Sequence, residues 1–233
     1  MNDTNSTSPI NLVELKKLVI RRFVAAIIVI GLVFFLPAGT LNYWQAWLWL
    51  FMLFFPMALV GLWLLRHDPA LLERRMRTHE KQKEQKRFAF LSLLFFLLVY
   101  LLPGFDRRFG WSSVPAGIII LADVLILLGY GLFILVMREN SYASRVVEVA
   151  TDQKVIKTGP YTVVRHPMYV SASLIWTLTP LALGSLWAFL LALLFPFLLV
   201  IRIRNEEKVL TEELPGYREY LQEVKYRLIP GIW

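Results

Sequence analysis

Residues 169–201, YVSASLIWTLTPLALGSLWAFLLALLFPFLLVI, form an apolar stretch that decides the fold and is interrupted near its middle. Pro180 and the pair Gly184-Ser185 divide it into two apolar arms, 169–183 and 186–201. Each arm is shorter than the roughly 20 residues that a full membrane crossing needs. Because both arms are apolar and the break between them is short, we predict a tight helical hairpin embedded in a membrane.

Four more apolar runs precede the hairpin, and together the six runs set the fold class. Hydrophobic residues make up 57% of the 233 residues and charged residues only 18%, whereas about 25% of a soluble domain is charged. In lipid, runs of this length satisfy their backbone groups as helices. We therefore predict an all-α, polytopic transmembrane helix bundle with six membrane segments, at residues 23–36, 43–65, 88–102, 114–137, 169–183 and 186–201.

Positive charge is distributed unevenly between the two sides of this bundle. If all six segments cross and the N-terminus is cytoplasmic, 23 of the 25 Lys and Arg residues are cytoplasmic, and Arg107 and Arg108 lie opposite. Cytoplasmic loops carry such an excess. We therefore expect both termini, segment 138–167 and tail 202–233 to be cytoplasmic. The net charge of +8 then reports topology and contact with anionic membrane lipids rather than binding of nucleic acid.

The chain has no cysteine, which excludes disulfides, thiolate catalysis and iron–sulfur clusters. Its histidines, His67, His79 and His166, are scattered, so we expect no metal site. The first apolar run follows basic residues and ends at Pro37-Ala38-Gly39, an order that is also typical of a signal peptide. Because an equally apolar run follows at once, we favour an uncleaved first helix.

Charged side chains follow the hairpin directly. Arg202 and Glu206 are four residues apart, so a continuing helix places them on one face, and Ile203 and Glu207 share another. Surface ion pairs are the plain explanation of such spacing. However, Arg202 comes immediately after the apolar arm, where a guanidinium can hold a carboxylate or phosphate in two hydrogen bonds.

The other end of the hairpin also carries ionisable groups. Pro167 suits the first turn of a helix and disfavours a helical conformation at His166. His166 then precedes a helix N-terminus, whose free N–H groups favour an anion. A capping histidine without chemistry is the alternative. Since ionisable groups at membrane segments are costly, we predict that both charged ends belong to a functional site.

Four sequence pieces in this region resemble the isoprenylcysteine carboxyl methyltransferase family, part of the membrane isoprenylcysteine and phospholipid methyltransferase superfamily. They are NSYASRVVEVATDQKVIKTG (140–159), TGPYTVVRHPMY (158–169), R-x-x-x-EE-x-x-L (202–210) and Y-x-x-Y-x-x-x-V-x-Y-R-L-I-P (217–230). The pieces occur in the family's order. The resemblance divides the chain into four N-terminal membrane segments, 1–137, and a methyltransferase-like core, 138–233.

The resemblance implies a membrane-embedded methyltransferase that uses S-adenosylmethionine and lacks the Rossmann sheet of soluble methyltransferases. It implies catalytic roles for Glu207 and for Arg202, which would face the substrate. Arg204 is the alternative substrate-facing residue, because the family motif can be aligned with either arginine of Arg202-Ile203-Arg204. The number of residues between Glu148 and Lys154 differs slightly from that in the family. The cofactor contacts that the resemblance implies are Glu148, Lys154, Val155, Ile156, Lys157, Tyr161, His166, Pro167, Met168, Tyr169 and Glu206.

The implied reaction is chemically consistent with these residues. A sulfonium methyl group is already activated and a carboxylate is ionised at neutral pH, so alignment and removal of water carry the rate without a general base. Arg202 would orient the acceptor carboxylate, and Glu206 would favour the cationic cofactor. An amine acceptor, as in the related phospholipid N-methyltransferases, would benefit from a base, and His166 or Glu207 would be the candidates.

Further alternatives stay open. A sterol-reductase-like NADPH oxidoreductase has a related terminal motif, RHxNYxGD, but RHPMYVS at 165–171 lacks its Asn. A transporter or assembly factor is the non-enzymatic alternative, against which the weakly polar N-terminal helices argue. We expect a structural role for Asp123 and an orientation signal in the charged segment 66–87. The expected partners are membrane lipids and a lipophilic or lipidated substrate.

Overall fold

The regular structure of this protein is helical. The computed structural model describes residues 11–76, 83–143, 149 and 152–233, and this part of the chain contains no strand. The predicted all-α class is therefore confirmed. The helices are α1 (Leu12–Ala38), α2 (Trp44–His67), α3 (Pro69–Met76), α4 (Lys83–Phe109), α5 (Ala116–Glu139), the short 3-10 helix η1 (Gly159–Thr162), α6 (Pro167–Ala182), α7 (Leu186–Ala192), α8 (Phe195–Glu213) and α9 (Tyr217–Glu223).

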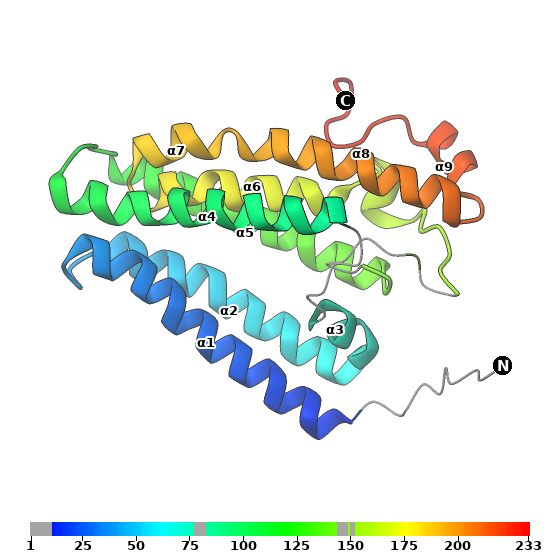
Figure 1. Ribbon diagram of the computed structural model, residues 1–233, viewed down its shortest axis with the longest axis horizontal. Helices are drawn as coiled ribbons and strands as arrows, with labels where there is room; N and C mark the ends of the chain where they lie inside the picture. The colour runs from blue at the N-terminus through cyan, green and yellow to red at the C-terminus, as the bar shows by residue number, and fades with distance from the viewer. Residues whose placement is uncertain (1–10, 77–82, 144–148, 150–151) are drawn as a thin grey trace.

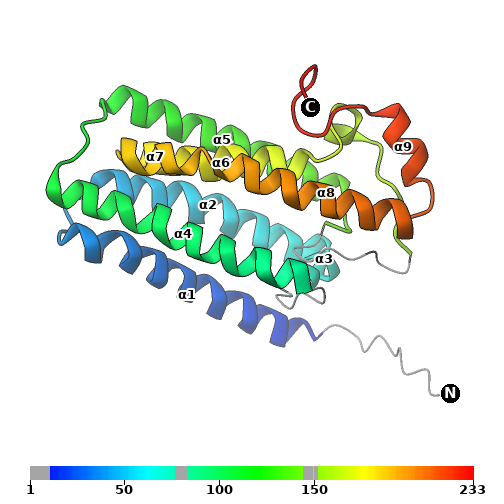
Figure 2. The ribbon, with the colours of Figure 1, turned by 45° about the horizontal axis from the view of Figure 1, so that its top comes forward.

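The long helices lie alongside one another in an elongated bundle (Figures 1 and 2). The turns α1–α2, α4–α5 and α6–α7 lie at one end of the bundle, which we call the turn end (Figure 1). The short elements α3, η1 and α9 gather at the opposite end, beside the segment that joins α5 to α6. We call this opposite end the pocket end, for the cavity described below.

Among the residues that the structure describes, four helical stretches are long and apolar enough to cross a membrane: α1, α2, α5, and α7 with α8 taken together as Leu186–Glu213. Of the 27 residues of α1, only Leu15, Phe34, Pro37 and Ala38 are buried within the protein. Lipid is the solvent that covers such an apolar surface, so this is an integral membrane protein. The other two predicted segments, 88–102 and 169–183, fold as parts of α4 and α6, and their crossing stays a prediction.

Helix α1 begins at Leu12, eleven residues before the predicted membrane segment 23–36. The Asn11 side chain caps the helix, accepting hydrogen bonds from the N–H groups of Val13 at 3.1 Å and Glu14 at 3.3 Å. Leu15 is buried in the first turn. The helix is therefore longer than its apolar run, because the cap at Asn11 and the basic residues before Phe23 extend the helix toward the pocket end.

The predicted hairpin is confirmed. Gly184 has φ +80°, which lets the chain reverse between α6 and α7, and the Ser185 side chain caps α7. A break at Leu193-Leu194, just before Pro196, separates α7 from α8. Helix α8 then runs past the apolar arm to Glu213, so Arg202 and Glu206 do share a helix.

Helices α5 and α6 approach each other closely at Gly129. A Cβ atom there would lie 3.1 Å from Ile175 Cγ1, which is tighter than ordinary side-chain packing. The Ser171 hydroxyl, fully buried, donates to the Gly129 carbonyl oxygen at 2.8 Å. This contact fixes the end of α5 relative to the start of α6, which are two of the elements that form the pocket.

A buried carboxylate closes the turn end. Asp106 of α4 accepts hydrogen bonds from the Ser112 N–H (2.7 Å), the Ser112 hydroxyl (2.6 Å) and the Ser185 hydroxyl (2.5 Å). The Tyr43 hydroxyl donates to the Leu183 carbonyl oxygen at 2.6 Å. These bonds join α4, the start of α2 and the α6–α7 turn, and they hold the hairpin in the bundle.

Candidate active site

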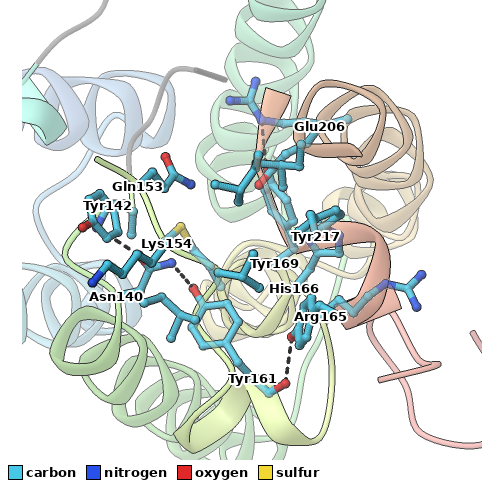
Figure 3. A pocket seen from close by; sticks show the side chains of 18 residues that line it. Asn140, Tyr142, Gln153, Lys154, Tyr161, Arg165, His166, Tyr169, Glu206 and Tyr217 are labelled. Atoms are coloured by element: carbon cyan, nitrogen blue, oxygen red, sulfur yellow. Dashed lines mark hydrogen bonds between the residues drawn. The ribbon is translucent and has the colours of Figure 1, made fainter. Parts of the chain in front are cut away.

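A pocket lies at the pocket end, where the end of α5, the segment before α6, the last turns of α8 and α9 meet. Its space, counted with its open mouth, is about 860 Å³. Figure 3 shows the lining side chains converging on this space. They are Asn140, Tyr142, Ala143, Gln153, Lys154, Val155, Ile156, Tyr161, Arg165, His166, Met168, Tyr169, Arg202, Glu206, Leu210, Leu214, Tyr217 and Tyr220.

The start of α6 is held in place by the C-terminal segment. Pro167 occupies the first helical position and His166 has a non-helical backbone (φ −125°, ψ 60°), as predicted. The backbone N–H of Arg165 donates to the Tyr226 carbonyl oxygen at 2.9 Å, and that of His166 donates to the Arg227 carbonyl oxygen at 3.0 Å. The chain before α6 is thereby paired with the chain after α9.

One face of α8 supplies a charged pair to the pocket. Arg202 and Glu206 both line it, and Tyr169 of α6 lies between them. The Tyr169 hydroxyl donates a short hydrogen bond to Glu206 Oε2 and accepts one from Arg202 Nε at 3.0 Å. Arg204 is exposed and does not line the pocket, so the helix register brings Arg202 to it.

The next residue, Glu207, lies behind the pocket wall in a buried ion cluster. Its Oε1 accepts from Arg165 Nε at 2.7 Å and lies 3.2 Å from His166 Nε2, and its Oε2 accepts from Arg227 Nε at 2.8 Å. Arg165 also donates to the carbonyl oxygens of Val224 and Lys225, both at 2.8 Å. Glu207 therefore ties α8 to the start of α6 and to the C-terminal segment.

The phenols of the pocket are neutral hydrogen-bonding groups. The pKa of Tyr161 is raised to about 12, chiefly by burial; the hydrogen bond from Asn140 opposes this rise and the nearby Glu206 adds to it. Burial also raises the pKa values of Tyr217 and Tyr220. The hydroxyls of Tyr161, Tyr217 and Tyr220 therefore keep their protons at neutral pH.

Most of the expected cofactor contacts come together here. Lys157 instead forms an ion pair with Glu223 at 2.6 Å, and Pro167 is buried in the first turn of α6 without lining the pocket. Glu148 lies outside the described residues. The expected contacts that line the pocket are Lys154, Val155, Ile156, Tyr161, His166, Met168, Tyr169 and Glu206.

Sequence reasoning assigned no role to several lining residues. Tyr217 and Tyr220 belong to the family-like motif at 217–230. Asn140 and Tyr142 follow the apolar run 114–137, and that position was the available signal for them. The lining residues that were missed are Asn140, Tyr142, Ala143, Gln153, Arg165, Leu210, Leu214, Tyr217 and Tyr220.

The part of the charged segment 66–87 that forms α3 also reaches the pocket wall, and the predicted role of this segment as an orientation signal stays a prediction. Leu71 and Leu72 of α3 are buried in a cluster with Tyr161 and Ala143. Arg75 Nη1 donates to the Ala143 carbonyl oxygen at 3.4 Å. The signal in the sequence was the Leu pair within a run of charges, which gives α3 one apolar face.

The family comparison agrees with this geometry. Residues 118–216 match the family model described as phospholipid methyltransferase. That family lies in the membrane methyltransferase superfamily predicted from the sequence motifs. The match begins within α5 and ends just before α9, so it includes the hairpin, the Arg202–Tyr169–Glu206 group and most of the pocket wall.

A curated relative shares part of the same region. The chain is 33% identical over 91 residues to the Delta(14)-sterol reductase TM7SF2 of Mus musculus. The alignment covers 37% of this chain and 22% of the reductase, so the chain spans about a fifth of that relative's length. The resemblance is therefore to a portion of the reductase.

Proposed function

We propose that this protein is an integral membrane methyltransferase that uses S-adenosylmethionine to methylate a lipophilic acceptor, with the carboxylate of an isoprenylcysteine-like molecule as the preferred acceptor. One observation carries the proposal: Arg202, Tyr169 and Glu206 form a hydrogen-bonded group in a pocket at the boundary of an apolar helix hairpin. The family match to a methyltransferase model supports it.

The lining residues fit the chemistry of S-adenosylmethionine. Glu206 gives a negative group for the cationic part of the cofactor, and Val155, Leu210 and Leu214 give apolar surface. The aromatic ring of Tyr217, a buried residue, adds a face for a planar base or a cation. A mostly apolar pocket with a few convergent polar groups is typical of a cofactor site.

When bound, the cofactor supplies an activated methyl group, so this chain has to align the acceptor and exclude water. Arg202 would bind the acceptor carboxylate, and its hydrogen bond to Tyr169 fixes the direction of the guanidinium. Glu206, held by the same hydroxyl, would lie on the cofactor side. Holding both reactants in this way converts a two-body encounter into a reaction within one complex.

Glu207 is assigned a positioning role in this proposal and not the role of a base. Both of its oxygens are engaged by cationic side chains, and Arg165, its first partner, is itself buried. Its place in the buried cluster supports the proposal that Glu207 holds His166 and the start of α6 in position. An ionised carboxylate acceptor needs no base, which is consistent with this arrangement.

An amine on a phospholipid is the alternative acceptor that the family description favours. The lone pair of an amine must be free of its proton before methyl transfer, so His166, which lines the pocket, would be the candidate base. The two acceptors differ in pH dependence. The rate of carboxyl methylation should depend little on pH near neutrality, whereas the rate of amine methylation should fall as the pH is lowered, because a protonated amine has no lone pair for methyl transfer.

The charge distribution supports placing the pocket end and both termini on the cytoplasmic side. Because the chain has no cysteine, single cysteines give a direct test. We expect Lys225→Cys to react in sealed inside-out vesicles but not in intact cells with a membrane-impermeant maleimide, and Ser113→Cys at the turn end to show the reverse. Equal labelling of both positions from one side would contradict the proposed topology.

A second candidate is an NADPH-dependent sterol-reductase-like activity, which the identity to the mouse reductase favours. The two candidates require different cofactors, so binding separates them. The decisive experiment is calorimetric titration of the detergent-purified protein with S-adenosylhomocysteine and, separately, with NADPH.

For this titration we expect micromolar binding of S-adenosylhomocysteine to the wild type and at least tenfold weaker binding to Glu206→Ala, since a charged partner contributes about 1.5–3 kcal/mol. Glu212→Ala is the matched control, because Glu212 lies on the same helix, is exposed and does not line the pocket. Binding of NADPH but not S-adenosylhomocysteine to folded wild type would overturn the proposal.

A further inference from the structure

Asn140, at the end of α5, has an amide orientation that its neighbours determine. Its Oδ1 accepts from the backbone N–H of Tyr142 at 2.9 Å, and a backbone N–H can only donate. The amide oxygen must therefore face Tyr142, and Nδ2 must face the other way. Nδ2 lies 2.7 Å from the hydroxyl oxygen of Tyr161 (Figure 3).

This orientation decides whether the Tyr161 hydroxyl donates or accepts the hydrogen bond with Asn140, which we call its polarity. An amide nitrogen donates and does not accept, so the Tyr161 oxygen accepts the hydrogen bond from Asn140. The hydrogen of the Tyr161 hydroxyl must then point elsewhere. Among the residues that the structure describes, Asn140 is the one hydrogen-bond partner of this hydroxyl, and Tyr161 lines the pocket.

The ring that carries this hydroxyl is fixed from its other side as well. The buried Tyr220 donates its hydroxyl to the Tyr161 backbone carbonyl at 2.7 Å. Tyr161 also packs in the cluster formed by α3 and the end of α5. Because its pKa is raised to about 12, chiefly by burial, the phenol keeps its proton at physiological pH. The donor is therefore permanent and held in a fixed position.

We propose that Asn140 is a positioning residue that makes Tyr161 a hydrogen-bond donor, and that this donor selects an acceptor atom of the cofactor in the pocket. The inference rests on the proposed function for the identity of the ligand. The acceptor atom belongs either to the carboxylate of the amino-acid part or to the adenosine part of the cofactor. Both are unprotonated acceptors at neutral pH, and the experiment distinguishes them.

Two substitutions change the donor in different ways. Tyr161→Phe removes the hydroxyl and keeps the ring. Asn140→Asp keeps the shape of residue 140 and its bond from the Tyr142 N–H, but replaces the donating NH2 by an accepting oxygen. Tyr161 would then donate to the introduced carboxylate and turn its hydrogen away from the pocket. The two variants should therefore lose the same ligand contact.

The test is calorimetric binding of S-adenosylhomocysteine, whose sulfur is uncharged, so the added charge of Asn140→Asp has no sulfonium to attract. We expect each single variant to bind about 3- to 10-fold more weakly than wild type. The double variant should bind no more weakly than Tyr161→Phe alone, because both changes remove one interaction. Asn205→Asp, on α8 and outside the pocket lining, controls for the charge.

Methylthioadenosine, which lacks the amino-acid part, identifies the acceptor. If its binding is unchanged by Tyr161→Phe, the acceptor is the carboxylate; if it weakens as S-adenosylhomocysteine does, the acceptor lies in the adenosine part. Both results support the proposal. Wild-type binding of S-adenosylhomocysteine by Tyr161→Phe overturns it, as does a further loss on adding Asn140→Asp to Tyr161→Phe.

A ligand-free measurement separates this inference from the proposed function. The intensity ratio of the tyrosine Raman doublet reports whether a phenol donates or accepts, and subtracting the Tyr161→Phe spectrum isolates Tyr161. We expect an accepting phenol in the wild type and a donating one in Asn140→Asp. If the wild type binds no S-adenosylhomocysteine but the doublet changes in this way, the proposed cofactor is wrong while the polarity of Tyr161 stands. An unchanged doublet overturns the polarity.

Discussion

The two ends of the bundle bury carboxylates in different ways. At the turn end, Asp106 is enclosed by the neutral donors of Ser112 and Ser185. At the pocket end, Glu207 is enclosed by two guanidinium groups and an imidazole, while the adjacent Glu206 faces an open pocket. The first arrangement is closed on itself, and the second has one carboxylate within a buried ion cluster and one that faces a cavity.

This difference separates structural polar groups from functional ones in a membrane bundle. A buried carboxylate bonded to hydroxyls and a backbone amide can be explained by the need to join two turns. The group Arg202–Tyr169–Glu206 joins α6 and α8, which already form a hairpin, and it lines a cavity. Position relative to a cavity, and not burial alone, therefore identifies the functional end.

The largest expected effect is on stability, and it comes from Glu207→Ala. Removing this carboxylate leaves Arg165 and Arg227 without their anion, which costs about 3–5 kcal/mol for a buried ion cluster. Asp106→Ala leaves only neutral donors unpaired, at a cost of about 1–3 kcal/mol. Thermal unfolding in detergent should therefore place Glu207→Ala well below Asp106→Ala.

The exposed pair Lys157–Glu223 gives a control for that ranking. Its side chains are 41% and 53% exposed, so Glu223→Ala should cost less than about 1 kcal/mol. If Asp106→Ala is the more destabilising of the two buried variants, the contrast between an ionic pocket end and a neutral turn end is wrong.

The next effect is on activity, and it distinguishes the guanidinium groups of the two ends. Arg202→Lys should lower kcat/KM for a farnesylated cysteine analogue by about 10- to 100-fold, because a point charge replaces a planar donor that Tyr169 orients. At the turn end, Arg107→Lys changes a bond to the Asn42 carbonyl oxygen and should leave the rate unchanged.

Arg204→Lys tests the register of α8 in the same assay. Arg204 is exposed and should behave like the turn-end control. A loss at Arg204 equal to that at Arg202 would mean that the substrate approaches from the outer face of α8.

The sequence predicted the features that depend on local patterns. The long apolar runs predicted the helical class, Pro167 predicted where α6 begins, and the four-residue spacing predicted that Arg202 and Glu206 share a face. These features follow from helix periodicity and from the lipid environment, both of which are readable from neighbouring residues.

The sequence did not reveal features that depend on contacts between distant segments. Helix periodicity predicted that Glu206 and Glu207 lie on different faces, but which face lines a pocket and which is buried depends on the packing of the C-terminal segment. Likewise, α3 reaches the pocket through Leu71 and Leu72, which are distant in the sequence from Tyr161. Such long-range contacts leave no short-range periodicity to read.

A smaller effect is expected from two tyrosine hydroxyls, that of Tyr169 at the pocket end and that of Tyr43 at the turn end. Tyr169→Phe disconnects Arg202 from Glu206 and should weaken S-adenosylhomocysteine binding by about 2- to 10-fold with little loss of stability. Tyr43→Phe loses the bond to the Leu183 carbonyl oxygen, so it should lower the unfolding temperature without changing binding. Calorimetry and thermal unfolding of both variants test this contrast. Weaker binding in Tyr43→Phe together with a lower unfolding temperature in Tyr169→Phe would contradict it.

The smallest effect is an alkaline loss of stability that should be concentrated at the pocket end. Burial raises the pKa of Tyr161 from about 10 to about 12, so the folded state holds its proton more tightly than the unfolded state. The resulting stabilisation is fully present below about pH 10 and is lost as the pH rises toward about 12. Unfolding temperatures measured across this range should therefore fall, and they should fall less steeply in Tyr161→Phe, which has no phenol to ionise. An equally steep fall in Tyr161→Phe would assign the alkaline loss to other buried phenols, such as Tyr217 and Tyr220 of α9.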